Sequence, residues 1–318
     1  MVQIPEAVVV SPRRTRQRAK LAAAASTADN SSDLTLRLST STPASNSIPK
    51  ENGIRVLPEI LIASLKLKDL RKRDLQLLLK KRRLLQAHPV AIPKDIHTKG
   101  LTPSIMATLV FAQEEAGTAV CISPTGLLLT CSHCIAETPS EFDQTRSHWL
   151  LFASGQVVEA VPLAWDAVRD LALLKIVAAQ QQSPSSSNIS TTAFPFITPA
   201  TSPPPIGSRL ICVGHPGSED LEAAEPGVET GYDVLHLSTG TFRGCAEGQD
   251  AQDNSEIGAL MHTCWTYWGH SGAPLIERKN GGLVGLHSSW DDETGMRRGV
   301  ALEAIRGFLE ENKQHRDG

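Results

Sequence analysis

Three features that assign many chains to a broad class are missing from this sequence of 318 residues. No apolar run approaches the ~20 residues that a membrane-spanning helix requires. The formal net charge is only -3, which gives no reason to expect a nucleic-acid partner. The amino terminus also lacks the order of a secretory leader, because its short apolar run, 7–10, precedes the basic cluster 13–20. We therefore expect an intracellular chain, in the cytoplasm or the nucleus, with no membrane span.

Composition divides the chain into three predicted parts. Residues 1–56 are rich in Ser, Thr, Ala and Pro and are predicted to be disordered. Their basic patch, 13–20, is either a nuclear localisation signal or a solvated run of charge. Residues 57–98 are predicted to form a basic amphipathic helix, 57–87, followed by a connector. This helix either packs on the body of the protein or a second copy, which we prefer, or contacts another protein or an anionic surface.

The remaining part, 99–313, contains a candidate nucleophile turn, Gly269-His270-Ser271-Gly272-Ala273. A serine hydroxyl is a poor nucleophile at neutral pH and needs an adjacent general base. His133 supplies an imidazole, whose ordinary pKa suits that role. Asp170 supplies a carboxylate that can hold the required tautomer of the imidazole. The three residues occur in the order His, Asp, Ser, each beside a segment that reads as a buried strand.

The same turn contains two candidate hydrogen-bond donors for an oxyanion. Gly269 has no Cβ, so its amide can turn toward a substrate carbonyl. The amide of Ser271 lies two residues further on. Together these two amides are predicted to form the oxyanion hole, in which one donor is worth roughly 2.7–4 kcal/mol.

These motifs resemble those of trypsin-like serine proteases with the chymotrypsin fold, closest in pattern to the HtrA (Deg) branch. The segments that carry the resemblance are 117–126, 166–172, 213–217, 238–244 and 299–302, in addition to the serine turn. The resemblance covers residues 100–312 and implies a serine endopeptidase that acts on polypeptides and needs no metal or cofactor. Two alternative functions remain: a non-catalytic protease-like scaffold, and a nuclear interaction protein in which the tail and the basic helix matter most.

The resemblance also implies an all-β architecture of two six-stranded antiparallel β-barrels with a C-terminal helix. The first barrel is expected at 99–181, a linker at 182–206, the second barrel at 207–302 and the helix at 302–312. In the first barrel, strands are expected at 105–111, 119–122, 127–130, 148–152, 157–161 and 171–177. The active site is then expected in the groove between the barrels.

This sequence departs from the pattern of its relatives in three places. Secreted trypsins carry an acidic residue before the serine, which binds the new amino terminus after activation cleavage, whereas this chain has His270. We therefore expect that the enzyme is not activated by zymogen cleavage. Ala273 replaces a glycine that is usual in the family, which leaves the backbone geometry of the turn intact. The chain ends soon after the expected final helix, so we expect no PDZ domain.

Substrate choice is predicted from segments that line the pocket in the family. The candidate pocket residues are Trp265, Thr266, Leu286 and His287. The segment 264–268 contains no Asp, so cleavage after Arg or Lys is not expected, and we expect an apolar residue before the cut. Ser288 occupies the position whose hydroxyl supports the catalytic acid in the family.

Six cysteines are present, and without a secretory leader we expect them to be reduced. A zinc site is the alternative use for some of them. Its candidate ligands are Cys131, Cys134, His262 and Cys264, of which only the first two have a Cys-x-x-Cys spacing. We favour no metal.

Overall fold

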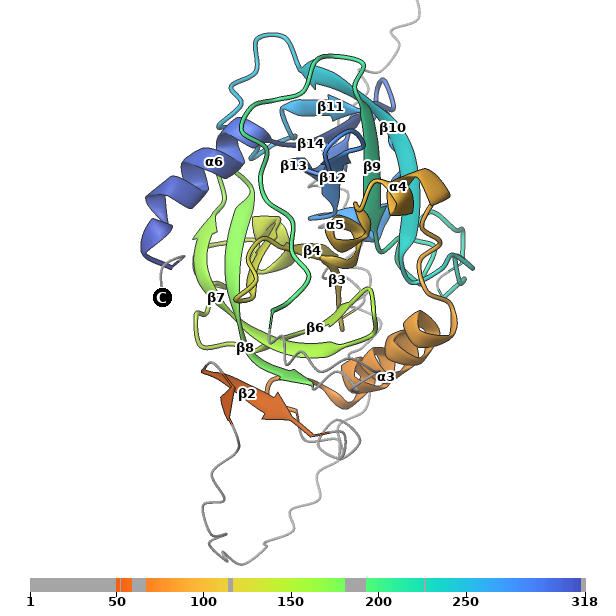
Figure 1. Cartoon of the computed structure of the whole chain (residues 1–318), viewed down its shortest axis with the longest axis vertical. Coiled ribbons are helices and arrows are strands. Elements are labelled where there is room, and N and C mark those ends of the chain that lie inside the picture. The colour runs from red at the N-terminus through yellow and green to blue at the C-terminus, as the bar shows by residue number, and fades with distance from the viewer. Residues whose placement is uncertain are drawn as a thin grey trace, which may run out of the picture.

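The computed structural model describes residues 50–51, 53–58, 67–113, 117–180, 193–225 and 227–315 of the chain. Two closed β-barrels lie one above the other along the long axis of the molecule (Figure 1). The final helix, α6 (Leu302–Glu311), packs on β13 and β14 of the second barrel. Its last turn reaches the first barrel, where Glu311 pairs with Arg169 at 2.6 Å. A 3₁₀ turn, η4 (Lys313–His315), follows the helix.

The first barrel closes in the order β8-β5-β4-β3-β6-β7, with β7 pairing back onto β8. Its strands are β3 (Thr108–Phe111), β4 (Thr118–Cys121), β5 (Leu127–Thr130), β6 (His148–Phe152), β7 (Val157–Asp166) and β8 (Leu171–Gln180). Four of them, β3 to β6, are buried at every position. Buried apolar and β-branched residues of this kind favour short strands. Closure of the sheet gives each of these four strands a neighbour on both sides.

The second barrel closes in the order β10-β11-β14-β13-β12-β9. Its strands are β9 (Arg209–Gly214), β10 (His236–Cys245), β11 (Leu260–His262), β12 (Pro274–Glu277), β13 (Leu283–Trp290) and β14 (Arg297–Ala301). All pairings within the two barrels are antiparallel. The predicted fold of two six-stranded antiparallel barrels is therefore confirmed.

The amino-terminal boundary differs from the prediction of disorder up to residue 56. Residues of this part form two strands, β1 (Lys50–Glu51) and β2 (Ile54–Leu57). β2 pairs in parallel with the end of β8, where Arg55 lies opposite Ala178, and Arg55 forms an ion pair with Glu159. The far end of β8 extends beyond its pairing with β5, and so it offers an edge on which another strand can add. The rest of the predicted tail, 1–49, including the basic patch 13–20, lies outside the described residues.

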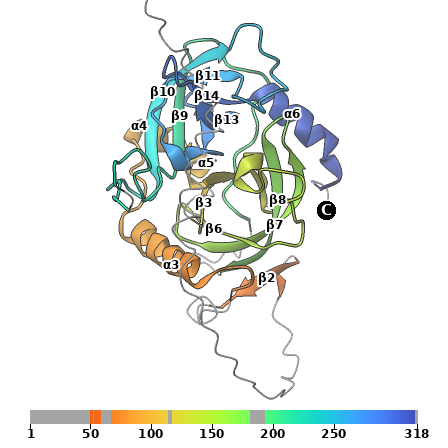
Figure 2. The ribbon, with the colours of Figure 1, turned by 180° about the vertical axis from the view of Figure 1, so that it is seen from behind.

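The predicted helix 57–87 is shorter in the structure. Helix α3 spans Lys72–Ala87, Leu57 ends a strand, and residues 59–66 lie outside the described residues. The apolar side chains Leu75, Leu78 and Leu85 are buried, and the helix packs on β6 (Figure 2). Packing on the body of the protein is therefore the observed arrangement of this helix.

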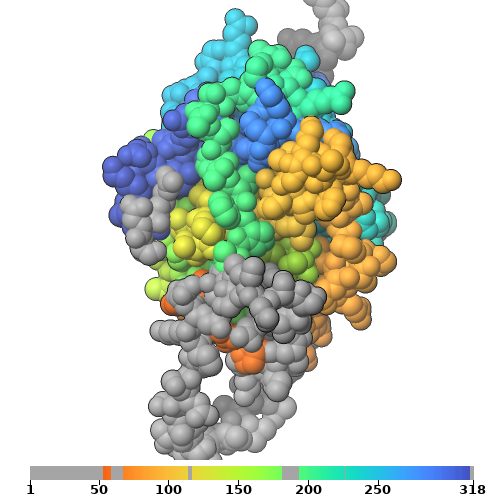
Figure 3. Space-filling model, in the orientation of Figure 1, coloured from red at the N-terminus to blue at the C-terminus, as the bar shows by residue number. Residues whose placement is uncertain are grey.

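Two short helices, α4 (Lys94–Thr98) and α5 (Thr102–Met106), precede the first barrel. The strand predicted at 105–111 starts only at Thr108, because residues 102–106 form α5, whose second residue, Pro103, favours the first turn of a helix. Of the predicted linker, 182–192 lies outside the described residues. Its second half, drawn in green in Figure 3, crosses the surface from the lower barrel to the upper one. Within the described residues, no helix is long and apolar enough to span a membrane.

Candidate active site

His133 lies in a short turn at the end of β5. The 3₁₀ turn η2 (Ser132–Cys134) begins two residues after the strand ends at Thr130. Thr130 pairs with Ala172 in β8, so η2 and the start of β8 lie at the same end of the barrel. The indole Nε1 of Trp165 donates to the carbonyl oxygens of Ser132 and Ala136, at 3.1 and 3.2 Å, and these bonds hold the turn in place.

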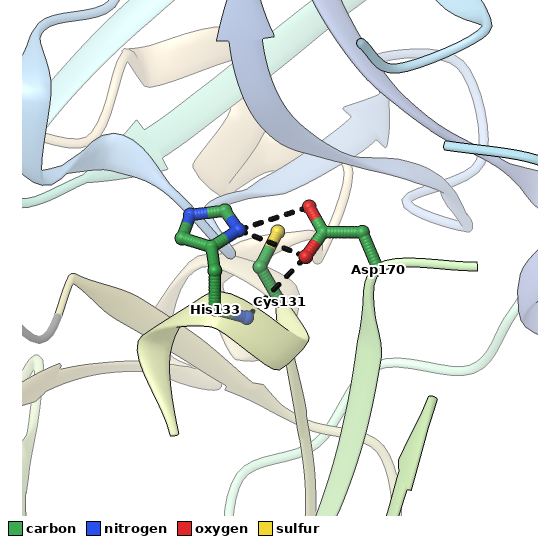
Figure 4. A group of neighbouring side chains, drawn as sticks. All are labelled: Cys131, His133 and Asp170. Atoms are coloured by element: carbon green, nitrogen blue, oxygen red, sulfur yellow. Dashed lines mark hydrogen bonds and ion pairs between the residues drawn. The ribbon is translucent and has the colours of Figure 1, made fainter. Parts of the chain in front are cut away.

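Asp170 lies directly before β8 and faces His133. Its backbone has a φ of 53°, a left-handed conformation that Asp tolerates better than most residues. Nδ1 of His133 lies 2.8 and 3.0 Å from the two carboxylate oxygens (Figure 4). The hydroxyls of Ser132 and Ser288 donate to the same carboxylate at 2.9 and 2.8 Å. These donors surround a side chain that is almost fully buried, and they stabilise its charged form.

Ser288 lies in β13, so the second barrel contributes a hydrogen bond to the acid of the first barrel. The contact predicted from the family position of Ser288 is therefore present as a hydrogen bond. Sequence reasoning missed Ser132 and Trp165. Ser132 had a weak signal, because it is a short polar residue next to His133, whereas nothing in the sequence places Trp165 under the turn.

Ser271 follows the 3₁₀ turn η3 (Trp268–His270) and is 4% exposed. Its hydroxyl donates to the carbonyl of Ser288 at 3.3 Å, which keeps Oγ beside the strand that supports Asp170. Gly272 has a φ of +84°, and a Cβ there would lie 2.0 Å from the carbonyl oxygen of Thr118. Glycine is thus required directly after the serine by both backbone conformation and space.

Gly269 and Ser271 are the residues predicted to supply the oxyanion donors. A Cβ at Gly269 would lie 2.4 Å from the carbonyl oxygen of His215 and 2.9 Å from the amide nitrogen of Gly217. The residue type at this position is therefore set by the close approach of the loop after β9. The carbonyl of Gly269 in turn accepts a hydrogen bond from the hydroxyl of Thr118 at 2.9 Å.

His270 occupies the position that is acidic in secreted relatives. It is fully buried, and its Nδ1 accepts a hydrogen bond from the amide of Tyr267 at 3.0 Å. Its Nε2 is buried without a hydrogen-bond partner in the described part of the chain. Burial and the neighbouring histidines lower the pKa of His270 well below its ordinary value, so this side chain is neutral at physiological pH.

The four predicted pocket residues lie in two environments. Trp265 is half-buried in an aromatic cluster, 5.0 Å from Tyr232 and 4.8 Å from His236 between ring centroids. Thr266, Leu286 and His287 are buried, and Leu286 belongs to the apolar core.

His287 Nδ1 lies 3.1 Å from Nε2 of His262, in the wall of the second barrel. Burial lowers the pKa of His262 to about 3, so His262 is neutral at physiological pH. The hydroxyl of Thr266 has no hydrogen-bond partner among the described residues. The sequence did not indicate the contact of Trp265 with Tyr232, which lies in the loop between β9 and β10.

Only one group of three potential metal ligands occurs within the described residues: Cys131, His133 and Asp170 (Figure 4). Their ligand atoms lie within 4.8 Å of one another, but Nδ1 and the carboxylate oxygens are already engaged with each other and with two serine hydroxyls. The zinc alternative, Cys131 with Cys134, His262 and Cys264, is not assembled. All six cysteines lie in the described part of the chain, and no disulfide is recorded among them.

The trypsin-like peptidase domain family matches residues 117–286, which include His133, Asp170 and Ser271. The chain belongs to this family, as the motifs predicted.

Solved structures with a similar fold include the serine endoprotease from Yersinia pestis, 19% identical over 70% of this chain and 67% of that chain, with a TM-score of 0.47. An inactive form of Rv3671c from M. tuberculosis H37Rv is 18% identical over 70% of this chain and 95% of that chain, with a TM-score of 0.46. The HtrA-type protease AlgW is 18% identical over 63% and 52%, with a TM-score of 0.44. No curated protein matches the sequence.

Proposed function

We propose that this chain is a serine endopeptidase in which Ser271, His133 and Asp170 act as nucleophile, general base and orienting acid. The observation that carries the proposal is the buried Asp170 carboxylate. It faces Nδ1 of His133 at 2.8 Å and accepts hydroxyl hydrogen bonds from both barrels. A carboxylate held in this way keeps the proton of a neutral imidazole on Nδ1, and Nε2 is then the nitrogen that can accept the serine proton.

In the proposed reaction, Oγ of Ser271 attacks the scissile carbonyl carbon while His133 takes its proton. The carbonyl oxygen becomes an oxyanion, and the amides of Gly269 and Ser271 donate to it. Collapse of the tetrahedral intermediate breaks the C–N bond, and His133 returns the proton to the leaving amine. Water then attacks the acyl-enzyme with the same base, which regenerates the hydroxyl of Ser271.

The proposed enzyme is not switched on by zymogen cleavage. In that mechanism a new terminal ammonium pairs with a carboxylate at the position of His270. A buried, neutral imidazole that accepts the amide of Tyr267 offers no charge for such a pair.

The natural substrate is a polypeptide, as the family implies. We expect the residue before the cut to be apolar and place it against Trp265, because Thr266, Leu286 and His287 of the predicted pocket are buried and present almost no surface to a substrate. We place the peptidase unit at 99–313 and the protein inside the cell, where thiols are kept reduced.

A fluorophosphonate probe tests the proposal, because an activated serine oxygen displaces its fluoride and becomes covalently phosphonylated. We expect the full-length chain to be labelled under reducing conditions and Ser271→Ala not to be labelled. Ser289→Ala is the matched control for Ser271→Ala. Ser289 is a buried serine of the same barrel, and its hydroxyl accepts a hydrogen bond from the amide of Gly258. If the wild type and Ser271→Ala are labelled equally poorly, the endopeptidase proposal fails and the non-catalytic scaffold becomes the better description.

A further inference from the structure

One residue of the first barrel contacts the nucleophile turn of the second barrel at several points. Thr118 is the first residue of β4 and is fully buried. Its amide donates to the carbonyl of Ser271 at 2.8 Å, and its hydroxyl donates to the carbonyl of Gly269 at 2.9 Å. The same hydroxyl accepts a hydrogen bond from the amide of His215 at 3.0 Å. Thr118 thus links β4, the loop after β9 and both carbonyls that flank His270.

The peptide planes explain why these contacts matter. Each peptide unit is planar, so a fixed carbonyl oxygen also fixes the direction of the amide across the same bond. Thr118 holds the planes that follow Gly269 and Ser271, which contain the amides of His270 and Gly272. The plane between them contains the amide of Ser271, and its carbonyl accepts from the amide of Ala273 at 2.7 Å. The plane with the Ser271 amide therefore lies between two planes that Thr118 holds, and it has little freedom to rotate while the hydroxyl of Thr118 is in place.

The backbone around Thr118 is fixed by further close contacts. The carbonyl of Thr118 accepts the hydroxyl of Thr130 at 2.7 Å. A Cβ at Gly117 would lie 2.7 Å from the carbonyl oxygen of Ser271, and one at Gly272 would lie 2.0 Å from that of Thr118. The segment 117–118 and the segment 271–272 therefore approach each other as closely as backbone atoms can. This close approach holds the threonine hydroxyl at a fixed distance from the turn.

We propose that Thr118 is a positioning residue whose hydroxyl, bridging His215 and Gly269, holds the nucleophile turn in the orientation that aims the amide of Ser271 at the oxyanion. The inference rests on the proposed peptidase function. Without the hydroxyl, the carbonyl of Gly269 and the amide of His215 lose their shared partner, and the planes around Gly269 can rotate. Misplacement by about 1 Å lowers the rate of a positioned reaction by about 100-fold.

Three variants of the full-length chain test this role. Thr118→Val keeps the β-branched shape and removes the bridge, whereas Thr118→Ser keeps the hydroxyl. Thr108→Val is the matched control, because Thr108 is equally buried in the neighbouring strand β3 but its hydroxyl has no partner among the described residues. We expect Thr118→Val to react with the fluorophosphonate probe about 100-fold more slowly than the wild type. Thr118→Ser should recover most of the rate, and Thr108→Val should match the wild type.

A second measurement does not need activity. Hydrogen–deuterium exchange of the amides in 266–272 should be faster in Thr118→Val than in Thr108→Val at a temperature well below unfolding. If the wild type is not labelled by the probe, the peptidase proposal fails, and the exchange rates still decide whether Thr118 holds the turn.

Two results would overturn the positioning role. The first is labelling and exchange in Thr118→Val that equal those of Thr108→Val, which would leave the hydroxyl without influence on the turn. The second is failure of Thr118→Val to fold, together with failure of a smaller variant made for this check, Thr118→Ala, while Thr118→Ser folds. In that case the hydroxyl is a requirement of the fold rather than of the site.

Discussion

Replacing Asp170 by Asn removes the charge from the proposed triad with the smallest change of shape. The carboxylate accepts hydrogen bonds from His133 Nδ1, Ser132 Oγ and Ser288 Oγ, at 2.8, 2.9 and 2.8 Å. An amide has only one acceptor oxygen, and its NH₂ group must face one of these former donors. The two hydroxyls can rotate, and the imidazole can change its tautomer.

The tautomer change determines the expected size of the effect. If the Asn amide donates to Nδ1, the imidazole proton moves to Nε2, and His133 can no longer accept the proton of Ser271. The same exchange of Asp for Asn in a serine protease triad lowers kcat by about 10⁴-fold. This factor corresponds to about 5.5 kcal/mol of lost transition-state stabilisation. We expect a loss of this order in kcat, with a much smaller change in KM.

The assay is steady-state hydrolysis of the best peptide from a cleavage library, with thermal unfolding as the check on folding. Asp166→Asn is the matched control. Asp166 lies in the same hairpin, accepts the amides of Val168 and Arg169, and pairs with the Arg169 side chain at 3.0 Å. It should retain most of the activity. A folded Asp170→Asn that keeps more than about a tenth of the wild-type kcat would refute the assigned role, because a neutral amide cannot replace the orienting carboxylate.

Three further predictions concern acid stability, the oxyanion turn and helix α3. Burial lowers the pKa of His148 to about 4, so the native state resists its protonation, and its contribution to stability is lost as the pH falls below 6.5. Urea unfolding should show that the wild type loses about 2 kcal/mol more than His148→Phe between pH 7 and pH 5. Gly269→Ala should abolish probe labelling, because its Cβ would lie 2.4 Å from the carbonyl oxygen of His215. Leu78→Ala should destabilise the protein by about 2–5 kcal/mol in the same urea assay, because Leu78 is fully buried.

Each of these predictions has a result that contradicts it. Equal pH dependence of the wild type and His148→Phe would mean that His148 is not buried as a neutral group. Gly282→Ala is the control for the oxyanion turn, because a Cβ there meets a flexible side-chain oxygen at 3.2 Å, and equal labelling of the two glycine variants would contradict the close approach at Gly269. Gln76→Ala, on the exposed face of α3, should leave stability unchanged, and a similar small effect of Leu78→Ala would mean that α3 does not pack on β6.

Helix α3 and the amino-terminal strands show where pattern reading reaches its limit. Leucine and basic residues alternate through 57–87 in a way that predicts one helix, yet Leu57 ends β2 on the edge of β8. The pairing partner lies more than a hundred residues away, so no local pattern contains it. In the same way, the basic pattern of the helix does not reveal that Lys81 is buried and that its ammonium donates to the carbonyl of Phe111 at 3.1 Å.

The amino-acid sequence by itself determined the candidates His133, Asp170 and Ser271, because buried strands and tight turns are written in local residue patterns. The two-barrel fold followed from the resemblance of these motifs to trypsin-like serine proteases. The tertiary structure alone decided that Ser132 donates to Asp170, that His270 is a neutral buried group and that Thr118 holds the serine turn. These contacts join the first barrel to the second, or a turn to a distant strand. Their distances depend on how the closed sheets pack against each other, which no short segment encodes.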